Sequence, residues 1–347
     1  MPTEELYNLH LGKSPPRGFE KVQIGPFCVE LVPEYSARLA ALPAHATKTV
    51  SYRFADPEDA DSQVVDPRTT NFKPAQRGAW EVTAMVTSSE VDPPETSLLT
   101  RNPIPDGGLW DLCTLLTFVT GRRVATGQQL DRFDPNSYGP PACIAIESLH
   151  AAALAWTHRK AIVEKNLVYA LQMHNEALGF SMLQITSALN NAALNVLVDR
   201  WAKRPSSSRQ KLATLKNVVC SAVDGCEDLA ADERAAFKAL LGSKIDQGLG
   251  SSLTDRTRAL LVDLGIIDKD PNDSVNRRIK FMNMIRNALT HSGQPPLLKG
   301  LTAEQSMRYT LAIVTGVVPD ISITAIGRIL GFTPSGLGSL KGRLRVA

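Results

Sequence analysis

The sequence predicts an α+β fold, in which a β-rich N-terminal region precedes a mainly α-helical bundle. Three observations in the 347 residues support this division. Before about residue 105, short runs of β-branched and aromatic residues alternate with polar stretches. From Leu109 onward, apolar residues recur at spacings of three and four, which is typical of helices. From Lys160 onward the helical pattern is almost continuous, and mostly short loops separate its segments.

Three segments of the N-terminal region have the composition of strands. They are Val22–Leu31, Lys48–Phe54 and Trp80–Ser88. The stretches between them are polar and contain proline and aspartate, as expected of surface loops. The segment Asp92–Pro105 is rich in proline, and we interpret it as a linker or an irregular crossing into the helical part.

The helical part begins with a segment whose apolar residues Leu109, Leu112, Leu116 and Val119 share one face, with Gly121 at a C-cap position. An alanine-rich helix is expected at Ala142–Trp156. The later helices are expected at Ile162–Ala177, Phe180–Lys203, Gln210–Val223, Asp232–Leu241, Ser252–Leu264, Asp273–His291, Ala303–Val314 and Ile321–Leu330. We therefore divide the chain into an α+β sensing or docking region, residues 1–165, and a helical bundle, residues 166–347.

Composition excludes several classes of function. The five cysteines are scattered and no CxxC or His-x-x-x-His pattern occurs, so we expect no metal site and no cofactor. No P-loop, GxGxxG, GxSxG or HExxH motif is present. The formal net charge of +3 permits a nucleic-acid partner without requiring one.

The sequence also predicts a cytoplasmic protein without a membrane segment. The N-terminus has no apolar signal-peptide core. The most apolar late run, Leu311–Val318, is expected to stop at Pro319 and is far shorter than the ~20 residues that a spanning helix needs.

The expected helix Asp273–His291 carries an unusual group of polar residues. Five apolar residues at helical spacing should bury one face of this helix, and these are Val275, Ile279, Met282, Ile285 and Leu289. Arg286 falls at the edge of that stripe, where a guanidinium costs desolvation unless it meets acceptors or an anion. Asn287 and His291 lie four residues apart and share a neighbouring face. Arg286 and His291 thus flank a polar sector without a carboxylate, and that sector can receive a phosphate.

These residue types suit metal-independent cleavage of RNA. The neighbouring 2′-hydroxyl attacks the phosphorus, and a histidine, whose pKa lies near neutrality, takes or gives a proton. An arginine stabilises the added negative charge on the phosphoryl oxygens, and Asn287 can orient either partner. One histidine does not easily serve as both base and acid, so a two-fold dimer would supply the second set. The structural alternative is that both residues only cap the helix end and its neighbouring loop.

The segment R-N-A-L-T-H, Arg286–His291, resembles the R-x4–6-H signature of the HEPN superfamily, in which a polar residue after the arginine is common. In addition, LWDLCTLLTFVTGRRV, Leu109–Val124, is similar to an element that precedes the HEPN part of ApeA-like anti-phage proteins. Those proteins pair a β-containing N-terminal region with a C-terminal HEPN domain. The resemblance therefore covers the order of parts along the whole chain.

The resemblance implies a HEPN bundle that forms a homodimer, with paired motifs making a metal-independent ribonuclease cleft. It implies Arg286 and His291 as catalytic residues, with Asn287 as the intervening polar residue. It also implies defence against phage or a related stress, with a phage-derived or protein trigger acting on the N-terminal region.

This sequence departs from the family pattern at one place. Many members carry an acidic residue on an earlier helix near the arginine. Here the expected helix Phe180–Lys203 has Asn190 and Asn191 at its centre and no acid before Asp199, while Glu176 lies just upstream.

A basic cluster surrounds the loop that follows this helix. Its members Arg200, Lys203, Arg204, Arg209 and Lys211 are predicted to contact RNA phosphates. A solvated basic helix end is the alternative interpretation of the same cluster.

Two other classes of function remain open. One is a catalytically inactive HEPN scaffold that binds RNA, nucleotide or protein. The other is a DNA-binding regulator, because Ile323–Leu344 resembles a helix-turn-helix with Gly327 in its first helix and Gly331 in its turn.

Overall fold

The computed structural model describes most of the chain. The described residues are 3–11, 20–41, 80–89, 98, 107–135, 139, 141–144, 147–179, 183–201, 206–249, 252–269, 273–292 and 294–335. At some helix ends, chiefly 206–212 and 243–249, the backbone alone is described.

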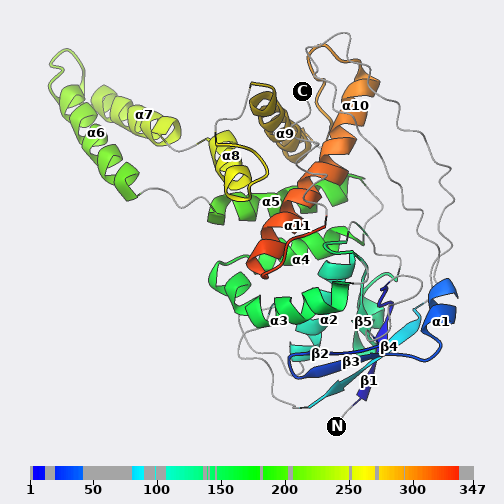
Figure 1. Ribbon diagram of the computed structural model, residues 1–347. Helices are drawn as coiled ribbons and strands as arrows, with labels where there is room; N and C mark the ends of the chain where they lie inside the picture. Colours follow the sequence, from blue (N-terminus) through cyan, green and yellow to red (C-terminus); the bar gives the residue numbers. More distant parts are fainter. Residues whose placement is uncertain are drawn as a thin grey trace.

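Five antiparallel strands form one sheet near the N-terminus, in the order β2-β3-β4-β1-β5 (Figure 1). The strands are β1 Thr3–Tyr7, β2 Lys21–Ile24, β3 Phe27–Leu31, β4 Val82–Ser88 and β5 Ala125–Thr126. In β3, Phe27, Val29 and Leu31 are buried and Glu30 is exposed, which is the alternation of a sheet with one face on the core. The predicted α+β class is confirmed.

The strand predictions are only partly right. Trp80–Ser88 corresponds to β4, whereas Val22–Leu31 is a hairpin of β2 and β3 rather than one strand. Gly25 turns the chain there with a φ of +57°, and a Cβ on it would lie 2.0 Å from Nε1 of Trp156. The strand β1 was not predicted, and Lys48–Phe54 lies outside the described residues.

Helices make up most of the remaining described chain. They are α1 Tyr35–Ala41, α2 Gly107–Thr120, the 3-10 helix η1 Gly127–Arg132, α3 Ser148–Glu164, α4 Val168–Ala177, α5 Leu183–Trp201, α6 Ser206–Asp224, α7 Ala231–Leu249, α8 Leu253–Asp263, α9 Asp273–Ser292, α10 Ala303–Ala312 and α11 Val318–Ile329. The predicted C-cap at Gly121 is confirmed, since its φ is +64°.

The helices stack outward from the sheet (Figure 1). Helix α3 contacts β2 and packs on α2, while α4 joins α2 to α5. Helix α5 is central to the C-terminal half, because α4, α8, α9 and α11 all contact it. One continuous apolar core runs from Leu6 in the sheet to Ile326 in α11.

The break between α3 and α4 differs from the expected one. Helix α3 runs through Trp156 to Glu164, and the turn is at residues 165–167, where Asn166 has a φ of +55°. Asparagine is one of the few residues other than glycine that adopts this left-handed conformation readily. The predicted boundary between the two regions, at residues 165 and 166, falls in this turn.

The expected stop at Pro319 is wrong. The chain is helical from Ala303 to Ile329, because a π-helical segment, Ile313–Val317, connects α10 to α11. Pro319 lies in the first turn of α11, where the wider π turn accommodates a residue without an N–H. Among the described residues this is one helix long and apolar enough to span a membrane, but 78% of its apolar window is buried inside the protein. A core helix of a soluble protein meets the same criteria.

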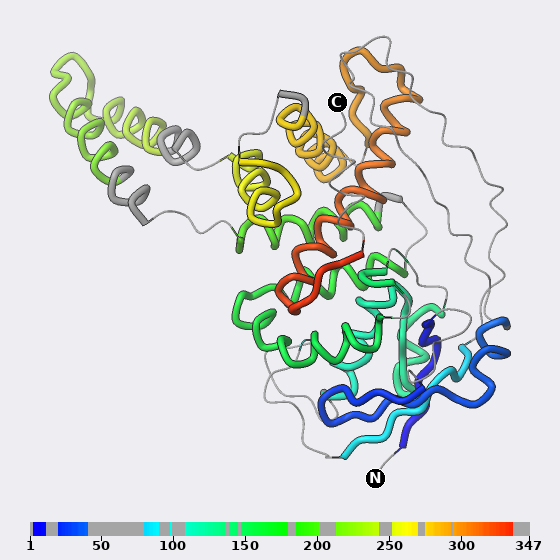
Figure 2. The backbone as a smooth tube through the Cα atoms, in the orientation of Figure 1, coloured from blue at the N-terminus to red at the C-terminus, as the bar shows by residue number. Residues whose placement is uncertain are grey.

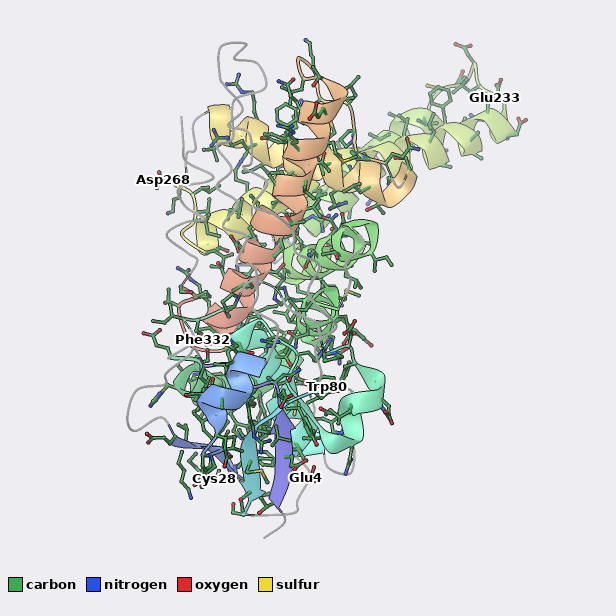
Figure 3. The ribbon with its side chains drawn as sticks, turned by 90° about the vertical axis from the view of Figure 1, so that its right-hand side faces the viewer. Glu4, Cys28, Trp80, Glu233, Asp268 and Phe332 are labelled. Atoms are coloured by element: carbon green, nitrogen blue, oxygen red, sulfur yellow. The ribbon has the colours of Figure 1, made fainter. Side chains whose placement is uncertain are left out.

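The α6–α7 hairpin extends away from the other helices (Figure 2). In a view turned by 90°, Glu233 marks its outer part, and Glu4 and Cys28 mark the sheet at the opposite end of the molecule (Figure 3). Four large apolar side chains of this hairpin are exposed, namely Leu215, Val218, Phe237 and Leu240.

Candidate functional site

Helix α9 places Arg286 as its apolar pattern predicts. Four residues of the predicted stripe are buried and Leu289 is partly buried; the buried four are Val275, Ile279, Met282 and Ile285. They face the core that α5 and α8 share with α9. Arg286, at the edge of the stripe, is half-buried, so its guanidinium lies at the border between core and solvent.

The guanidinium of Arg286 is held by two asparagines. Its Nη1 donates to Oδ1 of Asn195 on α5 at 2.7 Å, and its Nη2 donates to Oδ1 of Asn287 at 3.0 Å. Its Nε is buried and has no hydrogen-bond partner within the described part of the chain. The arginine is thus fixed between α5 and α9 by neutral acceptors, and its positive charge is not neutralised by a direct ion pair among these contacts.

An acid does lie near this arginine, one turn beyond Asn195. The carboxylate of Asp199 forms an ion pair with Arg256 of α8. Burial lowers the pKa of Arg286 from its ordinary value, Asp199 raises it, and Arg256 lowers it further. Because the ordinary pKa of an arginine lies far above neutrality, Arg286 remains a cation at neutral pH.

Neither the asparagines at the centre of α5 nor Glu176 supplies the acid expected near Arg286. Asn190 and Asn191 are buried, and Asn191 donates to the hydroxyl of Ser187 at 3.2 Å. Glu176 pairs with Arg123 at 3.0 Å. Asp199 acts on Arg286 electrostatically while binding Arg256.

Asn287 and His291 are both exposed on the last turns of α9. Asn287 accepts a hydrogen bond from Arg286, so the half-buried guanidinium is bound to a residue on the exposed face of α9. His291 is free of the core packing that fixes Ile285 one and a half turns earlier. An imidazole in that setting is accessible from solvent.

Asn195 is the residue of this site that the sequence analysis missed. It lies four residues after Asn191 and four before Asp199, so the three share one face of α5. That spacing was a usable signal, but the sequence did not show which turn of α5 meets Arg286.

The predicted RNA contacts are described only in part. Arg200 is exposed at the end of α5. Lys203 and Arg204 lie outside the described residues. Arg209 and Lys211 lie on the backbone of α6, and their side chains are outside the described set.

The helix-turn-helix-like segment is likewise described in its first half alone. Gly327 is buried in α11, where a Cβ would lie 2.7 Å from Cγ of Pro334. Gly331 follows α11 with a φ of +88°, as a turn glycine would. Residues 336–347, which include most of the expected second helix, lie outside the described part.

Within the described residues, no group of three or more His, Cys, Asp or Glu side chains is placed to hold a metal ion.

Comparison of the chain with protein-family models, with curated proteins and with solved structures finds no match in any of the three.

Proposed function

We propose that this protein is a HEPN-type, metal-independent endoribonuclease that acts in the cytoplasm, and that α9 carries its active site. The observation that supports this most is the setting of Arg286. A half-buried guanidinium is oriented by Asn195 and Asn287, and the exposed His291 follows on the same helix. A fixed cation, followed on the same helix by a solvent-accessible imidazole, suits a phosphodiester as substrate.

In the proposed reaction the 2′-oxygen forms a bond to phosphorus and the bond from phosphorus to the 5′-oxygen breaks. The 2′-hydroxyl loses its proton and the departing 5′-oxygen gains one, so charge and atoms balance without a metal. His291 handles one of these protons. Arg286 stabilises the extra negative charge on the phosphoryl oxygens in the transition state. Asn195 does not touch RNA and acts as a positioning residue.

The basic residues that follow α5 extend the proposed RNA path. Arg200 is exposed one residue after Asp199, and Lys203 and Arg204 continue the basic sequence. Contacts of this kind attach to phosphates and confer no sequence preference, so binding should weaken as salt rises.

The resemblance to HEPN proteins implies a homodimer, and we propose one here. The α6–α7 hairpin is where the copies would meet. Leu215 and Val218 share a face of α6 and are 40% and 60% exposed, and Phe237 and Leu240 share a face of α7 and are 49% and 55% exposed. Apolar faces on two adjacent helices suit packing into a four-helix arrangement.

The charges of the hairpin favour a second copy as the occupant of these faces. The end near its turn is acidic, with Asp224, Glu227, Asp228, Asp232 and Glu233. The first half of α6 is basic, with Arg209, Lys211 and Lys216. Two hairpins packed antiparallel about a two-fold axis would set the acidic end of each beside the basic half of the other. The proposed RNA contacts of Arg209 and Lys211 would then compete with this pairing.

We further propose, from the ApeA-like order of parts, a role in anti-phage defence or stress. The β-containing region would then receive a phage-derived or protein trigger, and the bundle would cleave RNA in response.

The test of the proposed function is cleavage of a structured RNA by the purified protein in EDTA. We expect cleavage, products ending in 2′,3′-cyclic phosphate, and resistance of a substrate with 2′-deoxy substitutions. Cleavage of the 2′-deoxy substrate at the same rate would contradict attack by the 2′-hydroxyl. RNA binding without cleavage, even with an activating phage component, would instead indicate an inactive scaffold.

A further inference from the structure

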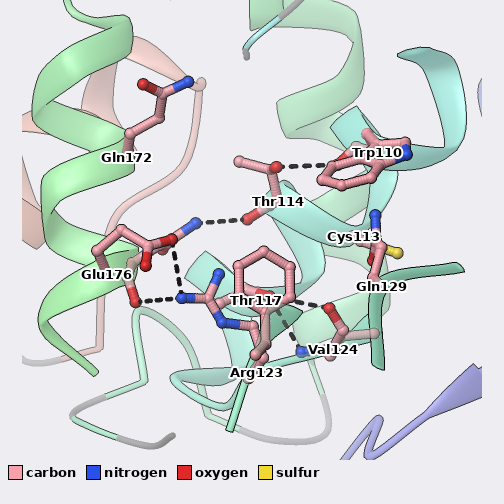
Figure 4. Close-up of a pocket in the computed structure, with 11 residues that line it drawn as sticks. Trp110, Cys113, Thr114, Thr117, Arg123, Val124, Gln129, Gln172 and Glu176 are labelled. Carbon is pink, nitrogen blue, oxygen red and sulfur yellow. Dashed lines mark hydrogen bonds and ion pairs between the residues drawn. The ribbon is translucent and has the colours of Figure 1, made fainter. Parts of the chain in front are cut away.

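A small pocket lies between α2, α4 and the segment of residues 123–133 (Figure 4). Its volume is about 40 Å³. Since a water molecule needs roughly 10–15 Å³ by this measure, the pocket holds about three waters, which is the size of a small oxyanion. No residue of α9 lines it, so it is separate from the proposed active site.

A buried cation forms one wall of the pocket. The side chain of Arg123 is 7% exposed. Its Nη2 donates to the backbone carbonyl of Asn175 and to Oε1 of Glu176, both at 3.0 Å, and the guanidinium lies 4.1 Å from the centre of the Phe133 ring. Burial lowers the pKa of Arg123, and Glu176 raises it. The buried charge therefore depends on a neighbouring anion.

The two partners of this ion pair are buried unequally. The side chain of Glu176 is 48% exposed, and its carboxylate can turn into solvent, where water hydrates it. Arg123 cannot leave, because its stem and guanidinium are packed between Phe133 and α4. Glu176 is thus the replaceable member of the pair.

Asn175 of α4 also lines the pocket. The Nδ2 of Asn175 donates to the carbonyl of Thr114 at 3.0 Å. Its Oδ1 is buried and has no hydrogen-bond partner within the described part of the chain. A buried amide oxygen of this kind favours a ligand that carries a proton donor.

We propose that this pocket binds a small protonated oxyanion of the hydrogen-phosphate type, which replaces Glu176 at the Arg123 guanidinium. The anion accepts from Nη2 of Arg123, and its hydroxyl donates to Oδ1 of Asn175. Helix α2 and Arg123 belong to the predicted N-terminal region and α4 to the predicted bundle. An anion bound here touches both sides of the predicted boundary, and this inference does not depend on the ribonuclease proposal.

Binding of inorganic phosphate to the full chain, measured by calorimetry near pH 7, tests the inference. Glu176→Gln removes the competing carboxylate while keeping the shape, so we expect phosphate to bind at least tenfold more tightly than to the wild type. Glu164→Gln, at the exposed end of α3, makes the same change in net charge away from the pocket and should leave affinity unchanged. Arg123→Lys should lose binding.

Two further results decide the matter even if Arg123→Lys does not fold. Sulfate, which carries no proton near pH 7, should bind the Glu176→Gln variant more weakly than phosphate does. Phosphate should also raise the Tm of that variant more than the Tm of the wild type. Phosphate affinity that is equal in wild type and Glu176→Gln would overturn the site. Equal affinity for sulfate and phosphate would overturn the role of Asn175.

Discussion

Replacing Asn195 by alanine removes the acceptor that holds the Arg286 guanidinium at 2.7 Å. A hydrogen bond to a charged group contributes about 1.5–3 kcal/mol net. If the oriented guanidinium stabilises the transition state, kcat for RNA cleavage should fall by about 10- to 150-fold, because ~1.4 kcal/mol corresponds to a tenfold change in rate. KM should change little, since Asn195 does not touch RNA in the proposed complex.

Single-turnover cleavage of an end-labelled RNA, together with KM from a substrate titration, measures this effect. Asn195→Asp keeps an acceptor for Arg286 and should retain most of the rate. Asn217→Ala, an exposed position on α6, is the matched control and should behave as the wild type. An Asn195→Ala variant that is folded and cleaves at the wild-type rate would show that Asn195 does not position the Arg286 guanidinium for cleavage.

Three further predictions concern stability and assembly. Burial lowers the pKa of His174 from 6.5 to about 4, so the unfolded chain binds this proton first as pH falls. The free energy of unfolding should therefore drop by about 3 kcal/mol as pH falls between those two values. In urea titrations, His174→Leu should flatten this pH dependence. Gly25→Ala should cost about 1–3 kcal/mol and lower Tm, because its positive φ and the adjacent indole leave no room for a Cβ; an unchanged Tm would contradict this. The double variant Val218→Lys, Phe237→Lys should reduce the mass measured by light scattering from twice 37.7 kDa to 37.7 kDa. The control Asn217→Lys should remain a dimer. If the double variant stays dimeric, the hairpin is excluded as the interface.

The helices whose sequence carries a periodic apolar face and clear end signals were predicted well. Helix α9 was expected at Asp273–His291 and runs over Asp273–Ser292, with its predicted stripe buried. Periodicity identifies such a face because burial acts on every third or fourth residue. The same pattern predicts Arg286 at the border of the core, and the structure places it there.

The partners of the charged residues were not predictable in this way. The fold buries Arg123 and pairs it with Glu176, 53 residues later. Asn195 was missed because only the packing of α5 on α9 decides which turn meets Arg286. Long-range contacts of this kind leave no local pattern in one sequence.

Local backbone rules also failed where the tertiary structure overrides them. Pro319 was expected to end a helix, yet a π-helical segment before it allows one buried helix to continue to Ile329. The turn at Asn166 was missed because the apolar pattern continues through it. At Pro319 burial of the surrounding residues outweighs the local preference.

The proposed function requires Arg286 and His291 to cleave RNA without a metal. Its most direct test compares wild type, His291→Ala and Arg286→Ala on one structured RNA in EDTA, with circular dichroism to show that all three are folded. We expect cleavage by the wild type and a loss of at least about 100-fold in each variant, which is the range for removing a general acid–base or an oxyanion stabiliser. Equal cleavage by the wild type and His291→Ala would contradict it.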